Sequence, residues 1–201
     1  MAADPPETRW TTDRVEAFSD GVFAIAITLL VLEIGIPPER FDDLWRALGE
    51  EWPSYLAYVT SFFTVGGVWL AHHRLFAEVE FVDPTLMRLN ILLLMAASFL
   101  PFPTGLLAEA FHASRDAERA AVVVYGATAL TIELLLAAAR HHAGVGTPMR
   151  RHGFPAALYV VAIVIGILVL PRLAAVGYLL VAARAVLGPE GEGGLVRPVH
   201  R

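Results

Sequence analysis

The sequence contains no cysteine and few charged residues. Without cysteine, the chain can form no disulfide, no thiolate metal site and no cysteine nucleophile. Only 17% of the 201 residues are charged, whereas 56% are hydrophobic, and the mean hydropathy is +0.58. Soluble domains rarely combine such values. We therefore interpret the chain as an integral membrane protein.

The sequence also lacks the short motifs on which many enzymes depend. It has no G-x-S-x-G, P-loop or dinucleotide-binding pattern. The pairs His72-His73 and His141-His142 are adjacent in sequence, and neighbouring residues on a helix point about 100° apart, so neither pair converges on one ion. We expect no enzymatic activity, no metal site, no cofactor and no nucleic-acid partner.

The apolar residues are grouped into segments of helical length. Six segments are bounded by proline, glycine or charged residues: 16–36, 53–76, 86–107, 117–140, 155–170 and 173–187. This pattern predicts an all-α polytopic membrane protein with six transmembrane helices in one domain, 14–187, between a tail at 1–13 and a flexible tail at 188–201. The last two segments are only ~24 Å long each and are divided at Pro171-Arg172, so one kinked or re-entrant segment is the alternative.

The arginines predict the orientation of these segments. With six crossings, ten of the 15 basic residues lie on the side that holds both tails, and five lie on the other side. The positive-inside rule therefore predicts that both termini are cytoplasmic. The opposite side is rich in acidic residues, which either form a cation-attracting mouth or are ordinary solvated loop charges.

The first segment, "RVEAFSDGVFAIAITLLVLEIGIPP" from residue 14 to 38, carries two kinds of side chain on different faces. On a helical wheel with Arg14 at zero, Ile25, Thr28, Leu29 and Leu32 fall within about 60° of it, whereas Ser19 and Asp20 fall at about 140° and 240°. The polar pair and the branched apolar stripe must therefore face different neighbours. Glu33 falls at about 100°, beside the stripe, and its role is open.

Asp20 needs polar partners, because an unpaired carboxylate near the membrane costs several kcal/mol. The end of the second segment offers Trp69, His72, His73 and Arg74, and the start of the third offers Arg88 and Asn90. We expect a polar cluster that joins these three helices at their cytoplasmic end. The alternative is that Arg14 and the histidines extend singly to the membrane interface.

Glu133 lies in the middle of the fourth segment. An ionisable residue at that depth is a functional candidate. It is equally well explained as a hydrogen-bonded contact between helices, with Tyr125, Thr128 or Thr131 as its partner.

Three stretches resemble a known family: "RVEAFSDGVFAIAITLLVLE" (Arg14 to Glu33), "WLAHHRLF" (Trp69 to Phe76) and "NILLLMAASFLPFPT" (Asn90 to Thr104). They are similar to the bacterial relatives of the endolysosomal potassium channel, transmembrane protein 175. The arginine and the Phe-Ser-Asp motif are the signature of that family.

The resemblance implies a six-helix subunit of a homotetrameric, potassium-permeable channel in the bacterial inner membrane, with the first helix lining the pore. It implies a hydrophobic gate at Ile25, Leu29 and Leu32, a contribution of Thr28 to selectivity, and no carbonyl filter. It also implies a structural polar network, for which we take Arg14, Phe18, Ser19, Asp20, Trp69, His73 and Asn90. The alternative function is a secondary transporter or a proton-leak pathway that uses Glu133.

Overall fold

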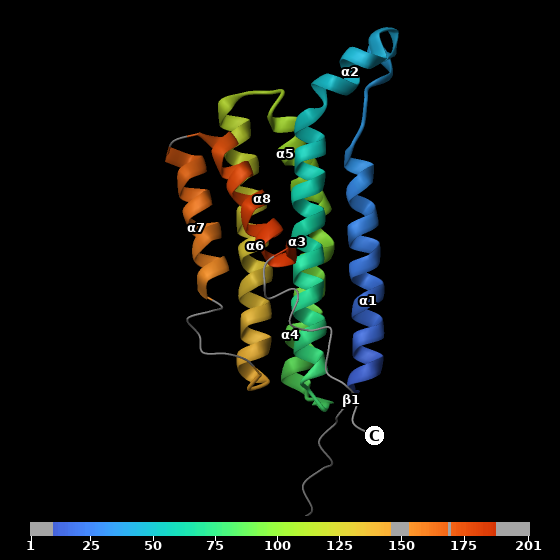
Figure 1. Cartoon of the computed structure of the whole chain (residues 1–201), viewed down its shortest axis with the longest axis vertical. Helices are drawn as coiled ribbons and strands as arrows, with labels where there is room; N and C mark the ends of the chain where they lie inside the picture. The colour runs from blue at the N-terminus through green and yellow to red at the C-terminus, as the bar shows by residue number, and fades with distance from the viewer. Residues whose placement is uncertain (1–9, 146–152, 169, 188–201) are drawn as a thin grey trace, which may run out of the picture.

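The computed structural model describes residues 10–145, 153–168 and 170–187. These residues form an elongated bundle of helices, with α1 at one edge and α7 at the other (Figure 1). The predicted tail at 188–201, most of the tail at 1–13, and Arg150 and Arg151 lie outside the described residues.

The long helices are close to the predicted segments. Their bounds are α1 Thr12–Leu29, α3 Trp52–Ala77, α4 Pro84–Phe99, α5 Pro101–Ala110, α6 Arg115–His142, α7 Gly153–Leu168 and α8 Pro171–Leu187. Two short strands, β1 (Trp10–Thr11) and β2 (Phe81–Val82), pair antiparallel beside the start of α1. Between α1 and α3 lie the 3-10 helices η1 (Leu30–Glu33) and η2 (Pro38–Asp43) and the helix α2 (Leu44–Glu50).

Local sequence explains most of the helix starts. Proline stands in the first turn of α3, α4 and α5, where its missing N–H costs no hydrogen bond. The side chains of Asp83 and Ser114 accept hydrogen bonds from the backbone N–H of Leu86 and Ala117 and so cap α4 and α6. The third predicted segment is divided at Leu100, because Pro101 cannot continue the backbone hydrogen bonding of α4.

Four helical stretches are long and apolar enough to cross a membrane: Thr12–Glu33, Trp52–Ala77, Pro84–Ala110 and Arg115–His142. The helices α7 and α8 are shorter and pack against each other, and α8 begins at Pro171 as the sequence indicated. At 1.5 Å per residue, α7 is ~24 Å long. The protein is therefore a helical membrane protein with at least four segments of spanning length.

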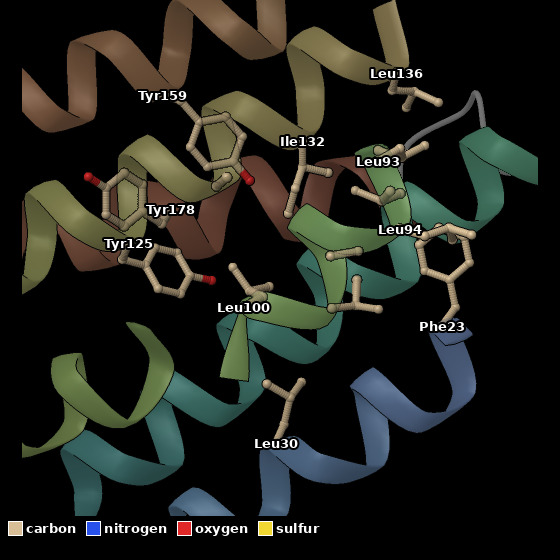
Figure 2. Close-up of a cluster of buried hydrophobic side chains, with 14 of the residues drawn as sticks. Phe23, Leu30, Leu93, Leu94, Leu100, Tyr125, Ile132, Leu136, Tyr159 and Tyr178 are labelled. Atoms are coloured by element: carbon tan, nitrogen blue, oxygen red, sulfur yellow. The ribbon is translucent and has the colours of Figure 1, made fainter. Parts of the chain in front are cut away.

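The core holds α1 through one face only. Val15, Ser19, Phe23, Ala26 and Leu30 are buried, and they follow one another at helical spacings of three or four residues. Phe23 and Leu30 point from α1 towards the leucines of α4 and the α4–α5 junction, and the tyrosines of α6, α7 and α8 fill the far side of the bundle (Figure 2). The opposite face of α1 is left exposed by residues 10–145, 153–168 and 170–187.

Candidate functional site

The uncovered face of α1 is the stripe that the helical wheel predicted. Ile25 is 62% exposed, Leu32 is 72% exposed, and Leu29 and Thr28 are exposed between them. Gly21 and Ala24, on the same side, are also exposed. A membrane helix that buries one face and exposes a stripe of branched apolar residues is suited to contact copies of itself or lipid.

Thr28 is the hydroxyl of this stripe. Its Oγ1 donates to the backbone carbonyl oxygen of Ile25 at 2.9 Å, a hydrogen bond within the same turn. The donor is therefore used, whereas the oxygen keeps lone pairs that can accept from water or face a cation.

A buried polar triad of Ser19, His72 and Asn90 joins α1, α3 and α4. Asn90 Nδ2 donates to Ser19 Oγ at 3.1 Å, and His72 Nε2 lies 2.8 Å from Asn90 Oδ1. Because the amide oxygen only accepts, His72 Nε2 carries the proton in this arrangement. The imidazole also stacks on Phe76 and meets the edge of Phe23. The triad thus fixes the register of three helices.

A second polar group lies at the surface beside the triad. Trp69 Nε1 donates to Asp20 Oδ1 at 2.8 Å, and His73 Nδ1 contacts the carboxylate of Glu16. The rings of Trp69 and His73 stack with their centroids 6.0 Å apart. The carboxylates of Glu16 and Asp20 are therefore held by aromatic side chains of α3.

The structure brings together five of the seven residues predicted for the polar network: Ser19, Asp20, Trp69, His73 and Asn90. It does not bring Arg14 or Phe18 to them. Arg14 is exposed and makes no hydrogen bond or ion pair with the described residues, and Phe18 is 64% exposed. Both residues lie on the uncovered stripe of α1, which faces away from α3.

Glu16 and His72 complete the contacts of the cluster. His72 was a candidate partner of Asp20 but not one of the seven residues taken for the network, and Glu16 was in neither group. Glu16 lies one turn before Asp20 on the same helix, and this i, i+4 spacing was the signal that could have identified it. His72 lies on the face of α3 that is turned to α1, and it is fully buried rather than extended to the interface.

Glu33 and Glu133 occupy positions that the sequence left open. Glu33 contacts Gly105 of α5 rather than the stripe. Glu133 is partly buried on α6, where it interacts electrostatically with Arg140 and Tyr159. Of the partners predicted for Glu133, Thr128 and Thr131 donate to their own helix backbone, and the Tyr125 hydroxyl bonds to Ser61.

The cluster and the stripe both lie in a region that a family model matches. The model of the endosomal/lysosomal potassium channel TMEM175 matches residues 14–101. The crystal structure of a lysosomal potassium-selective channel TMEM175 homolog from Chamaesiphon minutus superposes with a TM-score of 0.81 at 39% identity, covering 88% of this chain and 96% of that one. The chain belongs to the TMEM175 family.

Two curated relatives in the TMEM175 family are similar over part of the chain. A potassium channel of Streptomyces collinus is 53% identical over 111 residues, which are 55% of this chain and 54% of the relative. A potassium channel of Chamaesiphon minutus is 47% identical over 127 residues, which are 62% of each chain. The chain thus aligns with a little over half the length of these relatives. TMEM175 is a family of membrane ion channels and not of enzymes.

Proposed function

We propose that this protein is a potassium-permeable cation channel whose pore is lined by the exposed stripe of α1 from several copies of the chain. The observation that carries the proposal is the division of α1 into two faces. The carboxylates of Glu16 and Asp20 are bound within the chain by His73 and Trp69, whereas Ile25, Thr28, Leu29 and Leu32 are exposed on the other face. The names of the relatives as potassium channels support the same function.

A water-filled pore would accommodate the mixed side chains of the stripe. Arg14 and Thr28 lie on it together with the aliphatic residues, and Arg14 is exposed without an acidic partner among the described residues. A charged side chain on a membrane helix is stable where it reaches water or a water-filled cavity. Because Arg14 lies in the first turn of α1, its side chain would reach water at the membrane interface or in a pore.

The gate in this proposal is hydrophobic. Ile25, Leu29 and Leu32 are separated by three or four residues, so their rings would follow one another at intervals of ~5 to 6 Å along the axis. Rings of aliphatic side chains exclude water when they are narrow, and a cation cannot pass without replacing its hydration shell. Opening then requires only a small outward or rotational movement of α1.

Selectivity would be modest and would come from Thr28. A ring of threonine oxygens offers lone pairs to a partly hydrated potassium ion. The sequence contains no Thr-Val-Gly-Tyr-Gly motif of the kind that forms a carbonyl selectivity filter.

We further propose a homotetramer of six-helix subunits in the bacterial inner membrane, with both termini cytoplasmic. The TM-score of 0.81 over 96% of the Chamaesiphon homolog supports the same arrangement of helices, and the excess of arginine on the side of the termini supports the orientation. Copies of α1 around one axis would bury a stripe that a single chain leaves exposed.

The test is potassium flux from liposomes that contain the purified protein. Ile25→Asn should increase the flux, because a polar amide lets water enter the ring at residue 25. Leu134→Asn, at an exposed position on α6, is the matched control and should leave the flux unchanged. The proposal fails if neither the wild type nor Ile25→Asn conducts potassium.

The second candidate is a proton-leak or transporter pathway at Glu133. The specific observation in its favour is that Glu133 interacts with buried Tyr159, beside the hydrogen-bonded hydroxyls of Tyr125, Ser61 and Thr64. If this pathway operates, Glu133→Gln abolishes acidification driven by a proton gradient while potassium flux persists. Equal acidification by the variant and the wild type would exclude it.

A further inference from the structure

The 3-10 helix η1, which follows α1, ends in the carboxylate of Glu33, and its geometry determines where that carboxylate points. Residues 30–33 form the 3-10 helix η1, and Ile34 is extended. In a 3-10 helix, residues i and i+3 lie above one another. Glu33 therefore faces the same side as Leu30, which is fully buried, while Leu32 stays on the exposed stripe.

Glu33 occupies a notch on α5 that exists because residue 105 is glycine. A Cβ atom on Gly105 would lie 2.0 Å from Glu33 Oε2 and 3.1 Å from its Cδ. Any other residue at position 105 would push the carboxylate away. We refer to this contact as the Gly105 notch.

The carboxylate in the Gly105 notch is not paired. Glu33 is partly buried, and in the described part of the chain no hydrogen-bond donor or cation binds its oxygens. The charge that acts on it is that of Glu109, one turn further along α5, and this charge is repulsive. Partial burial of an unpaired carboxylate beside a second one destabilises a fold. Stability therefore gives no reason for an acid at this position.

We propose that Glu33 determines the conductance of the pore by attracting cations to the end of the pore formed by Leu32. This inference rests on the proposed function, since it requires α1 to line the pore. Glu33 follows Leu32 directly in sequence, so each subunit would hold one fixed negative charge at the level of the outermost aliphatic ring, on the side that is turned to α5. Permeant cations near the mouth would supply the counter-charge that the chain lacks, and their local concentration would rise.

The test is single-channel conductance in bilayers at low and high ionic strength. Glu33→Gln should lower the conductance by at least about twofold in about 10 mM potassium, where the Debye length is ~30 Å. It should leave the conductance unchanged in about 1 M potassium, where the Debye length is ~3 Å. Asp116→Asn, which removes an exposed charge from the first turn of α6, is the matched control and should have no effect at either concentration.

A second variant tests the Gly105 notch separately. Gly105→Ala keeps the charge but displaces the carboxylate, so it should alter the conductance at low salt only. The double variant Glu33→Gln/Gly105→Ala should then behave as Glu33→Gln alone. Gly66→Ala, which places a Cβ in open space on α3, is the control for the alanine substitution.

The outcomes separate this inference from the proposed function. A wild type that conducts, with a Glu33→Gln conductance that is equal to it at both salt concentrations or reduced equally at both, overturns the role of Glu33 and leaves the channel intact. A wild type that passes no potassium overturns the pore, and the role of Glu33 with it.

Discussion

At the scale of single residues, Asn90 connects α4 to the other two helices of the cluster. Both polar atoms of its amide form hydrogen bonds: Nδ2 donates to Ser19 Oγ, and Oδ1 accepts from His72 Nε2. Ser19 has a further bond to the Val15 carbonyl, so it keeps one partner if Asn90 is lost. His72 has no other hydrogen-bond partner among the described residues.

Replacement of Asn90 by leucine should therefore destabilise the protein mainly through His72. A buried donor without a partner costs about 1–3 kcal/mol. We expect Asn90→Leu to lower the unfolding temperature of the purified protein in detergent by several degrees. Ser98→Ala, which removes an exposed hydroxyl bonded only to Met95 of its own helix, should have almost no effect. Equal melting of the two variants would contradict the role of the triad.

The sequence predicted five of the seven network residues because a carboxylate at the start of a membrane helix requires polar partners, and few were available nearby. It could not assign Arg14 and Phe18 correctly. Their wheel positions, near 0° and 40°, already placed them on the apolar stripe. The role of Glu33 was left open, and a wheel of uniform α-helix cannot show that residues 30–33 form a 3-10 helix.

At the scale of elements, Asp83 ties three segments at one end of the bundle. Its Oδ1 accepts from Leu86 N–H at 2.7 Å and caps α4, and its Oδ2 lies 2.8 Å from His142 Nε2 at the end of α6. The neighbouring Phe81 and Val82 form β2, which pairs with β1 at the start of α1. Two hydrogen bonds lower the pKa of Asp83. The larger effect comes from the backbone N–H of Leu86 and the smaller one from the side chain of His142.

This pKa shift predicts how the cap depends on pH. Asp83 has a lower pKa in the folded state than its usual ~4, so the ionised form stabilises the fold above about pH 4, and this contribution is lost as the pH falls below that value. At pH 7, Asp83→Ala should be less stable than the wild type by about 1 kcal/mol. The difference between their melting temperatures should shrink below about pH 4. A constant difference from neutral to acidic pH would contradict the assignment.

The contact of α6 with α7 and α8 depends on Gly126. A Cβ at this position would lie 2.3 Å from the Tyr178 hydroxyl and 2.5 Å from Ile163 Cγ1. We expect Gly126→Ala to destabilise the protein by about 1–3 kcal/mol through overpacking. Gly66→Ala should be neutral in the same melting experiment. A Gly126→Ala variant that is as stable as Gly66→Ala would contradict the close packing of α6 on α7 and α8.

The helices themselves were predictable to within a few residues, because Pro84, Pro171 and the charged clusters mark where apolar runs end. The break at Leu100 was not predicted, although Pro101 and Pro103 were visible, since proline within an apolar run either kinks a helix or begins a new one. The short helices η2 and α2 were expected to be a loop. They are held by ion pairs of Arg40 with Glu50 and Glu51, which lie ten and eleven residues further along the chain and meet Arg40 only because the segment folds back between η2 and α2.

At the scale of the whole molecule, the proposed assembly depends on the exposed stripe of α1. The tetramer was implied by resemblance alone, because residues that face an axis and residues that face lipid are both apolar in sequence. The chain exposes Ile25, Leu29 and Leu32 at one edge of the bundle, where further copies can meet them (Figure 1). Whether α1 lines the pore can be measured directly.

The most direct measurement is block of potassium flux by a charged thiol reagent. The chain has no cysteine, so an introduced thiol is its sole site of reaction. Leu32→Cys places that thiol on the stripe, and Leu134→Cys places it on an exposed position of α6 as the control. If α1 lines the pore, the reagent blocks flux through Leu32→Cys and not through Leu134→Cys. Unchanged flux through a fully modified Leu32→Cys would contradict the account.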